Sequence, residues 1–202
     1  MGIISVAFVT CFIRTKHFSC KFSTNTTTIY HGVAVAPNVF TIHFINESMS
    51  TNTELTRAAR DHGISLKGIF LNNEIDKLKA EPGFYIFNLD RKKTNGDSGT
   101  HWVCAYCLPG LALYCDSFGQ PPTMEVENFL NAGFHMFKYT NRQVQDLDSD
   151  QCGLFCLSFG ATIQPYANNN KHAELAYEKW IGSFSSDYKK NDSVVLNLFN
   201  LT

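Results

Sequence analysis

Cys152 has the surroundings that a nucleophilic cysteine needs. It follows a polar loop, residues 146–151, and opens an apolar run that predicts a helix over 152–162. A thiol in the first turn of a helix faces the positive end of the helix dipole, which favours the nucleophilic thiolate. Gly153 follows, so no side chain there would obstruct a substrate carbonyl. The backbone N–H of Cys152 is also a donor that the helix leaves unpaired, and it could point at an oxyanion.

His101 and Asp116 fit the roles of the base and of the group that orients it. They lie on two strand-like runs within 101–118 that are joined at Pro109–Gly110. If this pair forms a two-residue turn, His101 and Asp116 are diagonal neighbours on one face, about 7–8 Å apart at Cα. If the turn starts one residue earlier, they lie directly opposite each other. A three-residue turn would break the match unless a bulge restored it.

A glutamine ahead of the cysteine is expected to supply a second oxyanion donor. Gln145 lies seven residues before Cys152, and its side-chain amide could donate this hydrogen bond. One such donor is worth about 3–4 kcal/mol, or about 10²–10³ in rate. Gln143 is a competing candidate by residue type alone. Trp102 is expected on the strand face opposite His101, as a core residue or a wall of the site.

The cysteines predict neither a disulfide framework nor a metal site. Their odd number, in a chain long enough to bury a core, indicates a reducing compartment with at least one thiol kept for chemistry. Cys104 and Cys107 form a C-x-x-C pair, but on a strand these positions face opposite sides, and a zinc site needs further ligands. We therefore expect no metal and no cofactor. The seven cysteines are at 11, 20, 104, 107, 115, 152 and 156.

The runs around these residues predict an α+β domain. A first helix is expected after Thr51, because Thr51 and Glu54 have capping-box spacing and Gly63 stands where a C-cap glycine belongs. Residues 68–78 predict a strand or turn leading into a short helix. The order of elements gives a mixed central sheet with helices packed around it. The other expected strands are 83–90, 101–107, 111–118 and 134–140, and the other helices are 123–132, 152–162, 173–184 and 193–199.

Size and composition fit one globular domain. Of the 202 residues, 44% are hydrophobic and 17% charged, and the formal net charge is −1, so bulk charge gives no reason to expect a nucleic-acid partner. The apolar run at 3–13 is too short to span a bilayer, and we expect no membrane partner. We predict a domain at 49–202. Residues 1–48 are interpreted as an N-terminal extension, with a processed segment or an upstream reading-frame artefact as alternatives.

Together these motifs resemble the adenain family of cysteine proteases, which includes the adenovirus proteases and the ubiquitin-like-protein proteases that remove SUMO. The family orders its site residues histidine, acid, glutamine, cysteine. The seven-residue spacing from Gln145 to Cys152 resembles the spacing in the adenovirus branch and in the proteases of large DNA viruses and Polinton-type mobile elements. In the SUMO branch the glutamine lies six residues before the cysteine. This chain has Asp146 at that position, and a carboxylate cannot donate to an oxyanion. The matching segments are GTHWV (99–103), YCDSFG (114–119), Gln145 and DQCGLFC (150–156).

The resemblance implies a thiol protease of papain-like chemistry with two sets of site residues. The catalytic residues would be His101, Asp116, Gln145 and Cys152, and Trp102 and Gly153 would line the substrate cleft. The orienting acid, Asp116, is the choice of the SUMO branch, where the adenovirus branch has Glu.

The function that the resemblance implies is cleavage of viral or mobile-element capsid precursors, at Gly-containing sites. The enzyme would be a monomer that acts in the host nucleus or cytoplasm, or packaged in the virion. An activating peptide stays open as a partner. The rival function is deconjugation of SUMO or another ubiquitin-like protein. A non-catalytic binding module and an acyltransferase with the same triad are further alternatives.

Overall fold

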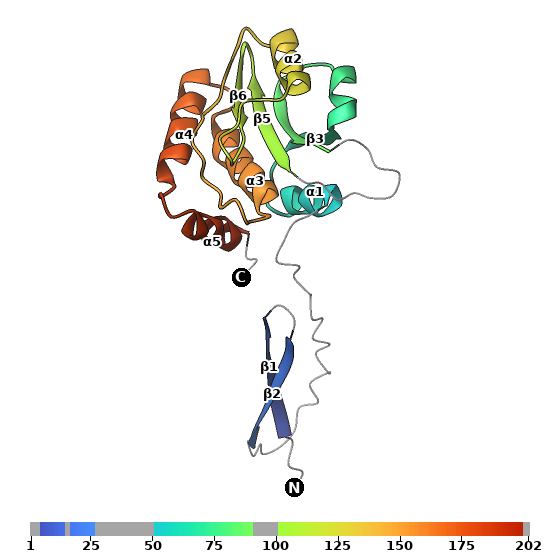
Figure 1. The fold of residues 1–202 in the computed structure, drawn as a ribbon, viewed down its shortest axis with the longest axis vertical. Helices are drawn as coiled ribbons and strands as arrows, with labels where there is room; N and C mark the ends of the chain where they lie inside the picture. The colour runs from blue at the N-terminus through green and yellow to red at the C-terminus, as the bar shows by residue number, and fades with distance from the viewer. Residues whose placement is uncertain (1–4, 15–16, 27–50, 91–100, 200–202) are drawn as a thin grey trace, which may run out of the picture. The chain divides into compact units, whose positions relative to one another are not determined.

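The computed structural model describes residues 5–14, 17–26, 51–90 and 101–199, with side chains in the last two ranges (Figure 1). The chain consists of two compact units, Met1–His43 and Phe44–Thr202. The described part of the first unit is an antiparallel hairpin of β1 (Ser5–Arg14) and β2 (His17–Thr26), an element that the sequence analysis did not predict. The rest of the 1–48 extension lies outside the described residues, as do Gly99 and Thr100, and the boundary at 48/49 stays a prediction.

The second unit is built on a five-stranded mixed sheet in the order β3-β4-β5-β6-β7. The three central strands pair antiparallel, whereas each outer pair, β3 with β4 and β6 with β7, is parallel. The predicted α+β organisation around a mixed sheet is therefore confirmed. The strands are β3 (Leu66–Leu71), β4 (Gly83–Asn88), β5 (Trp102–Leu108), β6 (Leu111–Cys115) and β7 (Met136–Lys138).

The first helix, α1 (Asn52–Asp61), begins and ends as the sequence predicts. The Thr51 side chain accepts from the N–H of Glu54, and the Glu54 carboxylate accepts from the N–H of Thr51, which completes the capping box. Gly63 follows the helix with φ +67°, a left-handed conformation in which glycine carries no Cβ penalty. Local chemistry therefore fixes both ends of this helix.

Two later helices start earlier than predicted. Helix α4 is capped by Asn169 and α5 by Asp187, whose side chains accept from backbone N–H groups in the first turn. Apolar periodicity is weak in these polar first turns, so it placed the starts at 173 and 193. The bounds are α2 (Met124–Gly133), α3 (Cys152–Ile163), α4 (Asn170–Ser183) and α5 (Tyr188–Leu198), with short 3-10 helices η1 (Asn72–Lys77) and η2 (Gln164–Tyr166).

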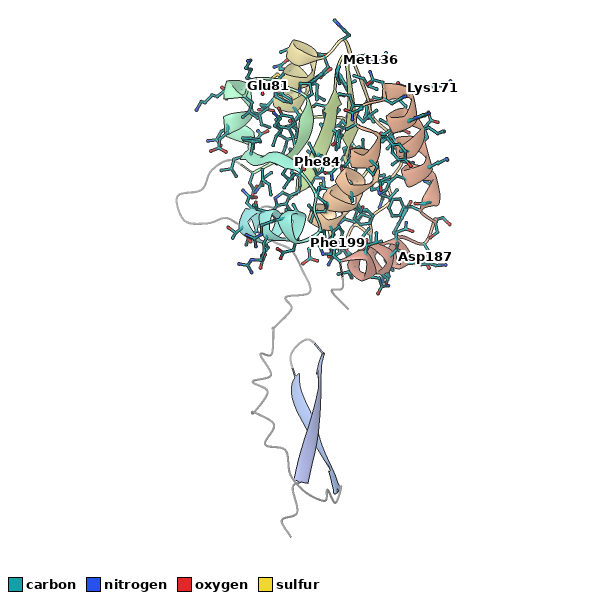
Figure 2. All side chains as sticks on the ribbon, turned by 180° about the vertical axis from the view of Figure 1, so that it is seen from behind. Glu81, Phe84, Met136, Lys171, Asp187 and Phe199 are labelled. Carbon is teal, nitrogen blue, oxygen red and sulfur yellow. The ribbon has the colours of Figure 1, made fainter. Side chains whose placement is uncertain are left out.

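Alternate strand residues divide between the two faces of the sheet. Side chains fill the space between the sheet and the helices around it (Figure 2). On one face Phe84, Cys104 and Leu113 join a core with α1, α3, α4 and α5. On the other face Tyr85, Val103 and Tyr114 join a second core with α2 and η1. Both faces of the central strands are thus buried, which explains why these strands read as nearly continuous apolar runs.

The hairpin of β5 and β6 has the first of the registers considered above. Leu108 pairs with Leu111 and Cys104 with Cys115, so Pro109–Gly110 is the two-residue turn. Gly110, the second residue of the turn, has φ +78°. A positive φ at this position favours glycine, which has no Cβ to clash. This register puts residues 101 and 116 on a diagonal at the far end of the hairpin.

Among the helices that the structure describes, none combines the length and the apolar character of a membrane span.

Helix α3 packs so closely on the sheet that Gly160 has no room for a side chain. A Cβ there would lie 2.3 Å from the Phe84 ring. We expect Gly160→Ala to lower the free energy of unfolding by about 1–3 kcal/mol through overpacking, measured by urea denaturation. The matched control is Gly182→Ala in α4, where a Cβ meets nothing within 4 Å.

This control should raise the free energy of unfolding by up to about 1 kcal/mol, since alanine favours a helix over glycine. Equal effects of the two substitutions would contradict the close packing of α3.

Candidate active site

The predicted site residues meet at the end of the sheet opposite the Pro109–Gly110 turn. His101 immediately precedes β5 and Asp116 immediately follows β6. Cys152 is the first residue of α3, the helix that covers this part of the sheet. Three elements that are distant in sequence therefore bring a base, a carboxylate and a thiol to one place.

His101 and Asp116 form a direct hydrogen bond of 3.0 Å between Nε2 and Oδ1. The Asp116 side chain is only 2% exposed, and its Oδ1 also accepts from the N–H of Phe118 at 2.7 Å. A carboxylate held in this way has little freedom to rotate, so it fixes one nitrogen of the imidazole. The geometry is that of a histidine oriented by an acid.

Phe118 covers one face of the imidazole. The two rings stack with centroids 4.7 Å apart and planes at 21°. Position 118 is the cross-strand partner of 101 when the hairpin register is continued past the strand ends. Carboxylate and phenyl ring together restrict both the tilt and the rotation of His101.

Cys152 acts on the same imidazole. His101 Nδ1 is buried and forms no hydrogen bond of standard geometry with the described residues. Cys152 nevertheless influences the ring through hydrogen-bonding and charge interactions. Because Asp116 occupies Nε2, Nδ1 is the nitrogen left to exchange a proton with the thiol.

The electrostatics of the pair favour a cationic histidine. The pKa of His101 is raised from 6.5 to about 9. Burial lowers this pKa, because it disfavours the charged ring, but the hydrogen bonds and negative charges of Asp116 and Cys152 outweigh it. Near pH 7 the imidazole is therefore protonated and could donate its proton to a leaving group.

The start of α3 leaves backbone donors available beside the thiol. Gln151 is the N-cap, but its side chain makes no capping hydrogen bond. No acidic residue lies in the first turn. The N–H of Cys152 therefore keeps the helix-terminal position at which a developing negative charge is stabilised.

Gln145 is fully buried and its side-chain amide has a defined orientation. Oε1 accepts from Ser117 Oγ at 2.6 Å, and Nε2 donates to the carbonyl of Ser149 at 2.8 Å and to Ser149 Oγ at 3.3 Å. Since a carbonyl only accepts, the atom facing Ser149 must be nitrogen. The amide is thus held with its N–H groups toward the loop that leads to Cys152.

Gln143, the competing candidate, has a different contact. Its Nε2 donates to the backbone carbonyl of Gln145 at 2.8 Å. This bond supports the backbone that carries Gln145. Of the two glutamines, Gln145 is the buried one.

Trp102 and Gly153 are packing residues in this structure, and their roles in a substrate cleft stay predictions. Trp102 is 2% exposed, and its Nε1 donates to Asn52 Oδ1 at 3.0 Å. A Cβ at Gly153 would lie 2.6 Å from a methyl carbon of Leu55. The glycine therefore lets α1 approach the start of α3.

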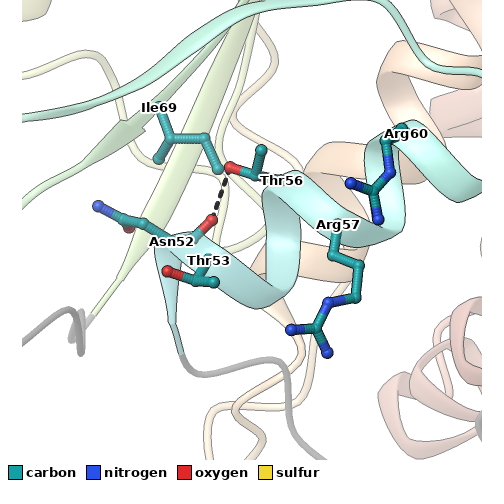
Figure 3. A pocket seen from close by; sticks show the side chains of 6 residues that line it. All are labelled: Asn52, Thr53, Thr56, Arg57, Arg60 and Ile69. Carbon is teal, nitrogen blue, oxygen red and sulfur yellow. Dashed lines mark hydrogen bonds between the residues drawn. The ribbon is translucent and has the colours of Figure 1, made fainter.

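A shallow pocket of about 380 Å³ lies along α1 next to this region (Figure 3). Asn52 belongs to its lining and also binds Trp102, the neighbour of His101. Figure 3 shows the side chains of Arg57 and Arg60 projecting from the helix. Two arginines therefore line this pocket, and one of them, Arg60, pairs with Asp61 at 3.2 Å.

Four further cysteines of the second unit are buried free thiols: Cys104, Cys107, Cys115 and Cys156. Burial raises the pKa of Cys104, Cys107 and Cys156, which makes them poor nucleophiles. Within the parts of the chain that the structure describes, no group of three or more His, Cys, Asp or Glu side chains is placed to hold a metal ion.

Sequence reasoning missed three polar residues that support the site. Ser117 and Ser149 hold the Gln145 amide, and Asn52 binds both Trp102 and Asn88. Ser117 follows Asp116 directly, and Ser149 lies in the polar loop before Cys152. The position of both serines next to the predicted site residues could have singled them out. The sequence did not show, however, that the segments around Ser117 and Gln145 lie side by side.

Comparison with known proteins gives one partial similarity. No family model matches the chain. Over 100 residues the chain is 31% identical to a candidate thiol protease of Acanthamoeba polyphaga mimivirus. The match covers 44% of this chain and 33% of the viral protein, so the matched segment spans about a third of that relative.

The raised pKa of His101 predicts that its imidazole titrates at a higher pH than an ordinary histidine. We expect its ring signals in NMR to titrate near pH 9, and Asp116→Asn to lower the midpoint because the main attraction on the proton is removed. The folded pKa lies above the ordinary 6.5, so the stabilisation by this pair is complete below pH 6.5 and is lost as pH rises through about 9.

Asp148→Asn is the control, because it removes an exposed carboxylate from the loop before Cys152 and leaves Asp116 in place. It should leave the midpoint in place. A wild-type midpoint near 6.5 would refute the proposed influence of Asp116 and Cys152.

Proposed function

We propose that this chain is a thiol protease in which Cys152, His101 and Asp116 form the catalytic triad and Gln145 completes the oxyanion hole. The observation that carries the proposal is the His101–Asp116 hydrogen bond beside a thiol at a helix start. The partial similarity to a viral thiol protease supports the same chemistry from independent information.

In the acylation step the sulfur of Cys152 attacks the scissile carbonyl carbon and forms a carbon–sulfur bond. The carbonyl electrons move to oxygen, and the oxyanion accepts hydrogen bonds from the N–H of Cys152 and the Gln145 amide. When the oxyanion collapses, the carbon–nitrogen bond breaks. His101 gives its proton to the leaving amine, and a thioester remains on Cys152.

In the deacylation step the neutral His101 takes a proton from water as the water attacks the thioester. A second oxyanion forms at the same place and collapses with loss of the Cys152 thiolate. The proton stays on His101, so the imidazolium–thiolate pair is restored. Asp116 stabilises the imidazolium throughout, in keeping with the raised pKa of His101.

The substrate that we propose is a capsid precursor of a virus or mobile element, cleaved at Gly-containing sites. The seven-residue step from Gln145 to Cys152 supports this branch, and the similarity to a mimivirus protein supports a viral setting. We propose a monomer that acts inside the host cell, in the nucleus or cytoplasm or packaged in the virion. An activating peptide and a nucleic acid are partners to be tested by addition.

Removing the nucleophile tests the reaction. We expect Cys152→Ala to lower kcat/KM for a cleaved peptide by at least about 10³-fold, because the thioester can no longer form. The measurement is hydrolysis of a fluorogenic peptide library followed by mass spectrometry of the products.

Cys107→Ala is the matched control, since it removes another buried thiol from the opposite side of the sheet. It should keep kcat/KM within about threefold of the wild type. Cleavage that survives in Cys152→Ala would refute the protease assignment, and a catalytic defect in both variants would point to misfolding instead.

A direct comparison of substrates separates the protease from the deconjugase. We expect the candidate capsid precursor to be cleaved and a SUMO vinyl sulfone probe to leave Cys152 unmodified. Covalent capture of the probe, without cleavage of the precursor, would establish the deconjugase. Transfer of an acetyl group from acetyl-CoA to a partner protein would instead favour the acyltransferase.

A further inference from the structure

We propose that Ser117 is a positioning residue that holds the Gln145 amide ready to donate to the oxyanion. This inference rests on the proposed function, because it gives Gln145 the role of an oxyanion donor. Ser117 is 2% exposed, and its hydroxyl donates to Gln145 Oε1 at 2.6 Å.

Backbone hydrogen bonds also hold Ser117 and Gln145 next to each other, independently of their side chains. The carbonyl of Ser117 accepts from the N–H of Val144 at 2.9 Å and from the N–H of Gln145 at 3.1 Å. The segment is anchored from its other side by Asn191, whose Nδ2 donates to the Val144 carbonyl at 2.9 Å. Ser117 therefore binds both the backbone and the side chain of the glutamine segment.

A nearby glycine makes this approach possible. Gly119 has φ +73°, and a Cβ there would lie 2.8 Å from backbone atoms of residues 141–143. Residues 117–119 thus pack directly on the backbone that leads to Gln145. The contact with Ser117 is a consequence of this close packing.

The Ser117 hydroxyl holds the amide in the orientation that the Ser149 carbonyl requires. The hydroxyl donates a hydrogen bond to Oε1, and Nε2 lies on the opposite side of the amide, facing Ser149. One N–H of Nε2 is well bonded to the Ser149 carbonyl at 2.8 Å, whereas the contact with Ser149 Oγ is longer, at 3.3 Å. The second N–H is the one that an oxyanion would engage in place of the hydroxyl.

The segment that follows β6 therefore supplies two neighbouring positioning groups. Asp116 orients the imidazole of His101, and Ser117 orients the amide of Gln145. One dipeptide thus serves the proton-transfer half and the oxyanion half of the site.

The test compares Ser117→Ala, Gln145→Ala and the double variant. Complete loss of an oxyanion donor costs about 10²–10³ in kcat, and loosening the donor should cost less, about tenfold, with KM unchanged. We expect the double variant to be no slower than Gln145→Ala, because Ser117 acts through that residue. Alkylation of Cys152 by iodoacetamide involves no oxyanion, so its rate should stay within about twofold in Ser117→Ala.

Ser158→Ala is the matched control. Ser158 is 3% exposed, and its hydroxyl donates to the Phe155 carbonyl and accepts from Trp180 Nε1. Its loss therefore leaves one buried group unpaired, as in Ser117→Ala, but away from the site. A fall in kcat that is equal in Ser117→Ala and Ser158→Ala, or a further fall in the double variant, would overturn the proposal.

A second readout needs neither activity nor a variant. The side-chain amide protons of Gln145 should exchange with solvent far more slowly than those of Gln120, whose side chain is exposed. Equally fast exchange in the wild type would overturn the positioning role, even if Ser117→Ala fails to fold. Absence of any peptide cleavage by the wild type, with slow exchange of the Gln145 amide protons, would refute the proposed protease and leave only the ordered amide of Gln145 established.

Discussion

The hydrogen bond between His101 and Asp116 depends on the register of one hairpin, and the rest of the site depends on that bond. The two-residue turn at Pro109–Gly110 sets the register, and the pairing then places residues 101 and 116 diagonally at the other end. A slip by one residue would send one of the two side chains to the opposite face of the sheet. The buried cores on both faces resist such a slip, because every residue of β5 and β6 is buried.

Close helix packing supplies the third member of the site. Glycines at 153 and 160 let α3 approach Leu55 of α1 and Phe84 of β4. The helix start that carries Cys152 is therefore held by apolar contacts on two sides. Polar groups are added where these segments meet, with Ser117 and Ser149 on the Gln145 amide and Asn52 on Trp102. Rigid surroundings of this kind suit a reaction that needs preorganised donors.

Charge is distributed unevenly around the site. Asp148 and Asp150 are exposed in the loop before Cys152, whereas on α1 the exposed Arg57 and Arg60 are accompanied by Asp61, which pairs with Arg60. The formal net charge of −1 hides this arrangement, since the opposing groups cancel in the sum.

The sequence by itself determined the local features of the second unit. Capping residues, turn glycines and apolar runs identified α1, the β5–β6 turn and α3, because each signal acts over a few neighbouring residues. The spacing of His101, Asp116, Gln145 and Cys152 indicated one chemistry in advance. Only the tertiary structure decided which hairpin register forms, that Trp102 and Gly153 are buried in packing contacts, and that Ser117 reaches Gln145. These outcomes depend on contacts between segments far apart in the chain, whose energies no local pattern records.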